Sequence, residues 1–522
     1  MAAVWFRRGV RLHDNPALCR ACESESVIPI FILDPHFVQP HRIGVNQFSF
    51  FRQALVDLDE QLRALGSRLV VLRGDPEKVW QDVFQGKCSF KVSNLLFEKD
   101  TSPYSMQRDE KVAALAEKHG VQVETFTSHT MLDIVATCNA PGFKAPTNNK
   151  GIEMLIGKAG VPQPLDVPKI PPCKIKGYEM FTMKELKYPT EPTHTTKGGE
   201  REGLAILARV CGDTKYVCNF NKTKTSSTQE HTSPKLAASL TTGLSPYLMS
   251  GAVSVRLVYH KVKAAIAGKA HTQAPESFLG QIYFREMFYI LGHSTPNFDK
   301  DTNKYCLQVP WGADNAKLAA WQEGKTGYPY IDALMRQLNQ TGWMHHLGRH
   351  AVACFLTRGD LWQSWEAGRD YFHKQLIDAD GALNNGNWMG LAGVAPWSAP
   401  WFRIYSPIPD GKSALNVEMD GAFVRKFVPE LKDMPAQYLF KPWEAPAAVQ
   451  TKAKCVVGKD YPKPIVDHAK ARNENLASFK AATQARAAAA GKQPAAKASP
   501  KAKAGAKRKA AQSGPAAKKT KK

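Results

Sequence analysis

Short apolar runs alternate with longer helical stretches over the first 130 residues, and no other feature of the sequence constrains the fold as strongly. The runs that predict β-strands are residues 3–6, 27–33, 69–72, 93–97 and 121–125. Between them, residues 48–65 and 104–119 repeat apolar side chains with the period of an α-helix. Asn15 and Pro16 are typical of a helix start, because proline fits the first turn. This alternation predicts a parallel sheet with helices on both faces.

The predicted α/β part carries no G-x-G-x-x-G after its first strand, so it does not predict a nicotinamide site. A cofactor at the carboxyl edge of the sheet stays open, because α/β sheets bind ligands at that edge. The ten cysteines are scattered along the chain and are expected to be free thiols. Cys19 and Cys22 form a C-x-x-C pair, for which helix packing is the simpler interpretation and a redox role the alternative.

Changes in composition divide the chain into four parts. Residues 1–130 form the α/β domain, and residues 131–199, rich in Pro, Lys, Thr and Gly, predict an interdomain linker over the surface. Residues 200–475 predict an all-helical domain, with amphipathic segments at 201–210, 253–267, 275–291, 316–320, 330–341 and 349–356. Residues 476–522 contain no aromatic side chain after Phe479 and predict a disordered basic tail.

The formal net charge of +23 extends beyond the tail, although residues 491–522 hold eleven Lys and Arg and no acid. A basic body with a basic tail predicts a polyanion partner, most simply nucleic acid, and a solvated basic surface is the alternative. The basic clusters at 507–509 and 518–522 are typical of a bipartite nuclear-import signal or of a DNA-binding arm. We therefore expect a nuclear protein, without a membrane span or a cleavable targeting peptide.

Polar side chains concentrate between residues 342 and 405. His346 and His350 are four residues apart and share one face if this segment is helical. Residues 378–388 add two carboxylates, three side-chain amides and a tryptophan, so the run predicts a polar pocket around a large cofactor. Alternatives remain for each part: a zinc half-site or a satisfied pair for the histidines, and a turn for the Asn-Asn-Gly at 384–386.

Four motifs in this half of the chain make it recognisable: residues 321–329, 342–354, 356–362 and 384–388. With residues 5–7 and 12–15, they strongly resemble the photolyase/cryptochrome flavoproteins, and most closely the (6-4) photolyases and animal-type cryptochromes. The resemblance extends from about residue 4 to about residue 468. It implies a Rossmann-like α/β domain with parallel strands, a wrapping linker and an all-helical domain that binds FAD. A deazaflavin or folate antenna in residues 1–130 is the second cofactor it allows.

The resemblance also implies which residues contact FAD. Residues 241–245 match the segment that binds the FAD phosphates, where hydroxyls and backbone N–H groups ahead of a helix suit phosphate oxygens. Arg349 and Asp378 match a salt-bridged pair beside the flavin. Asn384 matches the residue that faces flavin N5, where an amide accepts a hydrogen bond without adding charge. The expected cofactor positions are Thr241, Thr242, Gly243, Leu244, Ser245, Gln281, Arg285, His346, Arg349, Asp378, Asp380 and Asn384.

Two further sets of residues follow from the resemblance. The electron-transfer chain from the surface to the photoexcited flavin matches Trp388, Trp365, Trp311 and Trp362, for which core packing is the simpler reading. His346 and His350 match the pair that separates (6-4) repair from cyclobutane-dimer repair, with His346 as proton donor and His350 as its tuning partner. The residues expected to line the lesion cavity are Gln281, Phe284, Arg285, Arg403 and Tyr405.

Three positions depart from the family pattern. Phe284, Gly381 and Gly390 stand where the branch has tryptophan. Losing a stacking surface for an extruded base would cost about 1–3 kcal/mol of binding. Trp397 or Trp401 is expected to refill the space left at Gly390.

Two functions follow as competing hypotheses. The first is blue-light-dependent repair of (6-4) pyrimidine photoproducts in nuclear DNA, by electron transfer from FAD, in a protein expected to be a monomer. The alternative is a blue-light photoreceptor with circadian signalling, whose tail binds a protein partner. A flavin-containing DNA-binding protein without photochemistry is disfavoured, because all four positions of the electron chain keep tryptophan.

Overall fold

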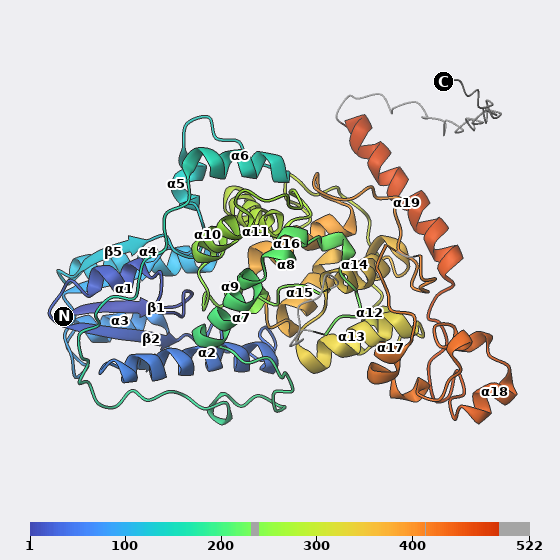
Figure 1. Ribbon diagram of the computed structural model, residues 1–522, viewed down its shortest axis with the longest axis horizontal. Helices are drawn as coiled ribbons and strands as arrows, with labels where there is room; N and C mark the ends of the chain where they lie inside the picture. Colours follow the sequence, from blue (N-terminus) through green and yellow to red (C-terminus); the bar gives the residue numbers. More distant parts are fainter. Residues whose placement is uncertain (231–239, 413, 490–522) are drawn as a thin grey trace, which may run out of the picture.

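The computed structural model describes residues 1–230, 240–412 and 414–489. Its N-terminal domain is built on a five-stranded parallel sheet in the order β3-β2-β1-β4-β5 (Figure 1). The strands are β1 (Ala2–Phe6), β2 (Val27–Leu33), β3 (Val70–Arg73), β4 (Asn94–Glu98) and β5 (Gln122–Phe126), so all five predicted strands are confirmed. In register, Ala2 of β1 pairs with Val27 of β2 and Asn94 of β4.

Helices cover both faces of this sheet, as predicted. On one face, α1 (Pro16–Ala21) and α2 (Val45–Ala64) pack against Val4, Phe6 and Phe31. On the other, α3 (Pro76–Phe84) and α4 (Pro103–Lys118) pack against Trp5 and Ile30. The predicted helix start is also confirmed, because the Asn15 side chain accepts the N–H of Leu18 as the N-cap of α1.

The segment expected to be a linker has two parts. It begins with two helices, α5 (Ile134–Asn139) and α6 (Asn149–Ala159), which the composition did not predict. Ile152 and Ile156, one turn apart on α6, are buried in the core of the helical domain. From residue 160 to 199 the only regular element is a short 3₁₀ turn, Lys184–Leu186, and this part crosses the surface of the α/β domain (Figure 1).

The second domain is helical and shares one large hydrophobic core. All six amphipathic segments predicted for this domain overlap helices of the structure. They are residues 201–210, 253–267, 275–291, 316–320, 330–341 and 349–356. Its α-helices are α7 (Glu200–Gly212), α8 (Thr214–Asn219), α9 (Ser245–Met249), α10 (Val255–Ile266), α11 (Phe278–Ser294), α12 (Asn315–Glu323), α13 (Pro329–Thr341), α14 (His346–Cys354), α15 (Trp365–Gln375), α16 (Gly381–Ala392), α17 (Ala422–Phe427), α18 (Ala447–Lys452) and α19 (His468–Ala489). Among the described residues, no helix is long and apolar enough to cross a membrane.

Helix α19 extends past residue 475, where the sequence placed the start of a disordered tail. Phe479 is buried on it, stacked on Trp401 at 5.5 Å and 6.2 Å from Trp311. Asn475 donates to the Gly359 carbonyl at 3.2 Å, and His468 pairs with Asp360. These contacts explain why the helix continues through a segment whose composition predicts disorder. The rest of the tail, with its predicted nuclear-import signal, lies outside the described residues.

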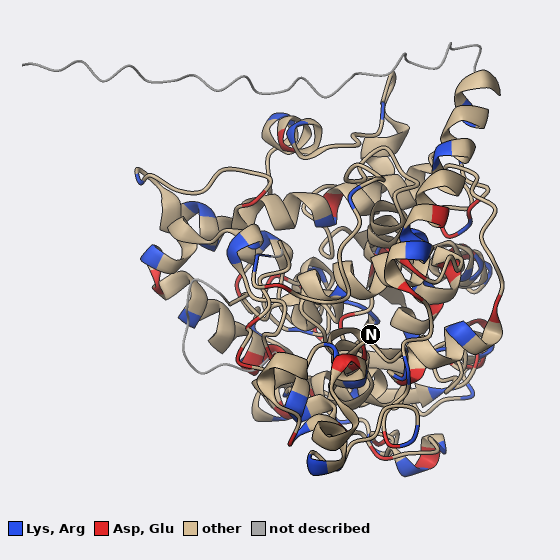
Figure 2. Cartoon of the chain, turned by 90° about the vertical axis from the view of Figure 1, so that its right-hand side faces the viewer, with Lys and Arg blue, Asp and Glu red and all other residues tan. Residues whose placement is uncertain are grey.

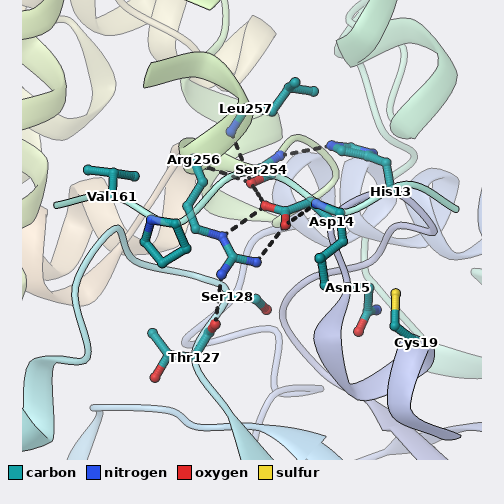
Figure 3. Close-up of polar contacts among 12 residues, drawn as sticks. His13, Asp14, Asn15, Cys19, Thr127, Ser128, Val161, Ser254, Arg256 and Leu257 are labelled. Carbon is teal, nitrogen blue, oxygen red and sulfur yellow. Dashed lines mark hydrogen bonds and ion pairs between the residues drawn. The ribbon is translucent and has the colours of Figure 1, made fainter. Parts of the chain in front are cut away.

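A buried ion pair joins the two domains (Figure 3). Asp14, which follows β1, is fully buried and accepts two hydrogen bonds from Arg256 of α10, at 2.6 and 2.9 Å. Ser254 donates its hydroxyl to the same carboxylate and its N–H to His13. A buried charge that loses its partner is costly, so this cluster holds the domains in one orientation.

Candidate functional site

The histidine pair lies at the start of α14. His346 is the first residue of the helix and His350 lies one turn later, with ring centroids 6.0 Å apart, so the two share a face as predicted. His345 caps the helix, because its Nδ1 accepts the N–H of Leu347 at 3.1 Å. The hydroxyl of Tyr405 lies 3.4 Å from Nδ1 of His350, which places one expected cavity residue beside the pair.

Lys222 belongs to this site, although the sequence did not single it out. Its Nζ lies 5.8 Å from the centre of the Phe284 ring, and its charge acts on both His346 and His350. Burial lowers the pKa of Lys222 to about 8. It stands in an Asn-Lys-Thr-Lys run, where nothing local separates it from other lysines of a basic chain.

Both histidines are neutral in this environment. Burial, followed by the charge of Lys222, lowers the pKa of His350 to about 3. Burial and the neighbouring His345 and Lys222 hold the pKa of His346 well below its ordinary value. Nε2 of His346 is buried and has no hydrogen-bond partner among the described residues. A cationic proton donor here therefore requires negative charge from a bound group, which the sequence could not reveal.

The predicted pair of Arg349 and Asp378 is present. Nη2 of Arg349 lies 2.9 and 3.1 Å from the two carboxylate oxygens of Asp378. Ser245, the first residue of α9, donates its hydroxyl to the same carboxylate at 2.7 Å. Just before α9, Gly243 takes a positive φ of 74°, which closes the 241–245 turn. Residues from three distant parts of the chain thus meet around one buried carboxylate.

Asp380 starts α16. Its Oδ1 accepts the N–H groups of Ala382 and Leu383, at 3.1 and 3.3 Å, as the N-cap. Its Oδ2 accepts from the hydroxyl of Tyr289 on α11 and lies 3.5 Å from Nη1 of Arg8. The Asp380 side chain therefore connects the helical domain to the end of β1.

The Asn-Asn-Gly at 384–386 is not a turn, because it lies inside α16. A Cβ on Gly386 would clash with the ring of Phe288, so this glycine permits close packing of α16 on α11. Nδ2 of Asn384 donates to the Arg369 carbonyl at 2.9 Å, which fixes the amide, and no hydrogen bond to its Oδ1 is seen among the described residues.

The remaining expected cavity residues lie on α11 and the 396–405 loop. The amide of Gln281 is turned towards its own helix start, donating to the carbonyls of Pro275 and Ser277. Arg403 is exposed, and its carbonyl accepts from Arg358 at 2.7 Å.

The four tryptophans of the predicted electron chain run from the core to the surface. Trp388 and Trp365 are almost completely buried, whereas Trp311 and Trp362 are partly exposed, with ring centroids 4.8 Å apart. Trp388 lies against Gly368 of α15, the helix that starts at Trp365. Two of the four are therefore buried and two reach the surface, and electron transfer through them stays a prediction.

The three departures from the family pattern differ in their surroundings. A Cβ on Gly390 would lie 3.2 and 3.3 Å from ring atoms of Trp397, so Trp397 and not Trp401 occupies this space. A Cβ on Gly381 would meet nothing within 4 Å, so this space stays open. The Phe284 ring stacks on Phe288 at 6.3 Å and faces Lys222.

Comparison with known proteins agrees with this arrangement. Residues 2–148 match the DNA photolyase family model, and residues 278–481 match the FAD binding domain of DNA photolyase. The chain is 43% identical to a (6-4) DNA photolyase of Arabidopsis thaliana, over 90% of this chain and 86% of that protein. It is 39% identical to Cryptochrome-2 of Gallus gallus, over 91% and 82%.

The fold comparison agrees as well. A bacterial class III photolyase from Agrobacterium tumefaciens superimposes with a TM-score of 0.76 at 28% identity, covering 92% of this chain and 98% of that one. The chain therefore belongs to the photolyase/cryptochrome family of FAD-binding proteins.

Proposed function

We propose that this protein repairs (6-4) pyrimidine photoproducts in DNA under blue light, with FAD bound between α9, α11, α14 and α16. The observation that carries this proposal is the buried Nε2 of His346, which has no partner in the described part of the chain and lies near His350 and Lys222. A buried polar atom without a hydrogen-bond partner lowers the stability of a protein. The unpaired Nε2 therefore indicates that a bound group supplies the missing partner. The similarity to the plant (6-4) photolyase supports the same assignment.

The residues present fit FAD. Nη1 of Arg285 is buried and has no partner among the described residues, so it offers a donor to an oxygen of the cofactor. Oδ1 of Asn384 offers an acceptor. Ser245, Arg349 and Asp378 supply a hydroxyl, a cation and a carboxylate in one connected set. When bound and reduced, FAD supplies the electron that light transfers to the lesion.

The role of His346 is to hold a proton for the lesion. Its pKa is lowered by burial, and the cations Lys222 and Arg349 lower it further. The negative charge of a reduced cofactor and of DNA phosphates opposes these effects, so protonation follows assembly of the complex. His350 sets the position of the pair through its contact with Tyr405.

The 396–405 loop is suited to DNA. Phe402 is 61% exposed, next to the cation Arg403. Arg358 fixes this loop by donating to the carbonyls of Trp401 and Arg403, both at 2.7 Å. An exposed aromatic side chain on an anchored loop suits insertion beside an extruded base. On the face in Figure 2, Lys and Arg are interspersed with Asp and Glu. We therefore assign recognition of DNA to local groups such as Phe402 and Arg403, and not to one broad basic surface.

The second candidate function is a blue-light photoreceptor. Phe284 and the open space at Gly381 favour it, since both reduce the aromatic surface available to a lesion. Phe479 favours it too, because this side chain links α19 to Trp311, one of the two partly exposed tryptophans of the predicted electron chain. A change of charge at Trp311 would then alter the packing of Phe479 and with it the position of α19. This helix precedes the tail expected to bind a protein partner.

A repair assay separates the two functions. Purified protein with reduced FAD is illuminated with blue light in the presence of oligonucleotides that carry a (6-4) photoproduct or a cyclobutane dimer, with dark controls. We expect light-dependent loss of the (6-4) lesion alone. In His346→Ala, repair should fall by about 10²–10⁴-fold while light still bleaches the oxidised flavin band, because only the proton donor is lost. His119→Ala, an exposed histidine on the α/β domain, is the matched control. Bleaching without repair of either lesion would favour the photoreceptor.

We also propose a nuclear location, supported by the basic clusters at 507–509 and 518–522. Replacing those lysines and Arg508 by alanine in the fluorescently tagged full chain should move the protein to the cytoplasm. An unchanged nuclear signal would refute this assignment.

A further inference from the structure

Two arginines lie at the point where a parallel sheet of this topology binds its ligand. The order β3-β2-β1-β4-β5 reverses direction between β1 and β4, and ligands of such sheets bind beyond the carboxyl ends of those strands. Arg7 and Arg8 follow β1 at this point, and Asp100 follows β4. The cavity beside Arg8 measures only about 10 Å³. Arg8 instead reaches out of the α/β domain towards the helical one.

Arg8 contacts four residues from four parts of the chain. Its Nε lies 3.7 Å from Asp100 of its own domain. Its Nη1 donates to the hydroxyl of Tyr289 at 2.9 Å, and lies 3.3 Å from Nε2 of His129 and 3.5 Å from Oδ2 of Asp380. Tyr289 belongs to α11 and Asp380 caps α16, so one side chain spans the domain boundary to the two helices that carry Arg285 and Asn384.

This cluster keeps Asp380 ionised. Burial alone would raise its pKa, but His129, whose Nε2 lies 3.9 Å from Oδ2, and the charges of Arg8 and Arg285 hold that pKa far below the ordinary value. An ionised carboxylate with one oxygen on the N-terminus of α16 and the other on Tyr289 has no freedom to turn. Arg8 is the charge from outside the helical domain that stabilises this state.

The same cluster contains an unsatisfied donor. Nη2 of Arg285 lies 3.0 Å from Nε2 of His129, and its guanidinium lies over the Tyr289 ring at 4.8 Å. Nη1 of Arg285 has no partner among the described residues, although the side chain is 94% buried, with 6% exposed. A buried guanidinium held on one side by a cluster and open on the other fits an acceptor oxygen of a bound molecule.

We propose that Arg8 is a positioning residue of the flavin site, which holds Asp380 directly and Arg285 through His129, so that the α/β domain helps to build the FAD site. The inference rests on the proposed FAD site and does not depend on which lesion is repaired. Arg8 acts on the cofactor through other side chains. Its replacement should therefore change how tightly FAD binds and how readily bound FAD is reduced.

Arg8→Gln tests this inference, and Arg256→Gln is its matched control. Both remove a guanidinium that crosses the same domain boundary, but Arg256 pairs with Asp14 and contacts none of the proposed FAD residues. In the full-length protein, FAD affinity is measured in the dark from flavin fluorescence on titrating the apoprotein, together with the flavin midpoint potential and the melting temperature of the apoprotein.

Arg8→Gln should weaken FAD binding at least tenfold and shift the potential, and Arg8→Lys should restore part of both because it returns the charge. Arg256→Gln should lower the apoprotein melting temperature while FAD affinity stays within twofold of the original protein. If Arg8→Gln does not fold, Tyr289→Phe, which removes only the hydroxyl between Arg8 and Asp380, should weaken binding in the same direction.

Equal effects of Arg8→Gln and Arg256→Gln on FAD affinity and on the midpoint potential would overturn the inference. Arg8 would then only stabilise the contact between the two domains. Unchanged affinity and potential in Arg8→Gln, or in Tyr289→Phe if the first variant is unfolded, would overturn it as well. Because these measurements need neither DNA nor light, a protein that binds FAD but repairs no lesion would refute the proposed repair and leave the inference standing.

Discussion

An indole at position 390 should be tolerated only when Trp397 is removed. Gly390 lies on α16, and a Cβ there would already touch Cδ1 and Nε1 of Trp397 at 3.2 and 3.3 Å. Trp397 is held by a hydrogen bond from Nε1 to the Gly386 carbonyl at 2.8 Å. Its ring packs against Phe288 and Tyr305, with centroids 5.9 and 5.6 Å away. Gly390→Trp therefore has to displace an anchored side chain.

The expected magnitudes follow from these contacts. Gly390→Trp alone overpacks the site and should lower the free energy of unfolding by about 1–3 kcal/mol. Trp397→Ala removes a partly buried indole and its hydrogen bond to the Gly386 carbonyl, which should cost about 3 kcal/mol. In the double variant the new indole enters the emptied space. Its cost should therefore be smaller than the sum of the single costs by about 1–3 kcal/mol.

Urea unfolding of the apoprotein, followed by circular dichroism, measures this coupling without a contribution from bound FAD. Gly381→Trp is the control, because a side chain at Gly381 would meet nothing within 4 Å and should not couple to Trp397→Ala. If Gly390→Trp and Trp397→Ala are additive within about 0.5 kcal/mol, the two positions do not share one space and the reasoning fails. If Gly381→Trp couples equally strongly, the effect is not specific to this contact.

Three further predictions concern the histidines, the C-terminal helix and the electron chain. Because His345 and His350 have pKa values lowered to about 3 in the folded protein, the unfolded chain binds more protons below pH 6.5. The free energy of unfolding should therefore decrease as the pH is lowered. The two histidines together should contribute a loss of about 3 kcal/mol between pH 7.5 and 5.5, measured by urea titrations. Phe479→Ala should cost about 3–5 kcal/mol in local stability and speed proteolysis of α19, since the ring is buried between Trp401 and Trp311. Trp311→Phe should slow light-driven bleaching of the flavin at least tenfold without changing FAD affinity, because the partly exposed end of the chain is interrupted.

Each of these predictions has a clear contrary outcome. A stability that is flat between pH 7.5 and 5.5 would mean that the histidines are not held neutral. His350→Gln should make the loss of stability over this pH range smaller by about 1.4 kcal/mol. Proteolysis of α19 at an unchanged rate in Phe479→Ala would show that the helix is held by its other contacts. Bleaching at the original rate in Trp311→Phe would exclude this residue from the path.

The sequence alone predicted the five strands, two of the helices between them and the helical second domain, because these follow from local patterns. The five strands show as apolar runs, and α2 and α4 as 3.6-residue periods, both within windows of twenty residues or fewer. The pairing of Arg349 with Asp378 and the shared face of His346 and His350 were also predicted, the first from the family pattern and the second from helical spacing.

The environment of the site was decided by tertiary contacts that no local window contains. Arg8 and Asp380 meet across 372 residues of sequence, and Lys222 reaches the histidines from another part of the chain. The Asn-Asn-Gly at 384–386 became helical because α16 packs on Phe288 of α11, although this tripeptide alone favours a turn. Phe479 kept α19 folded beyond the predicted boundary for the same reason. Periodicity determines which face of an element is buried, whereas the partner on that face, and with it the charge and the pKa of each site residue, depends on how distant elements pack.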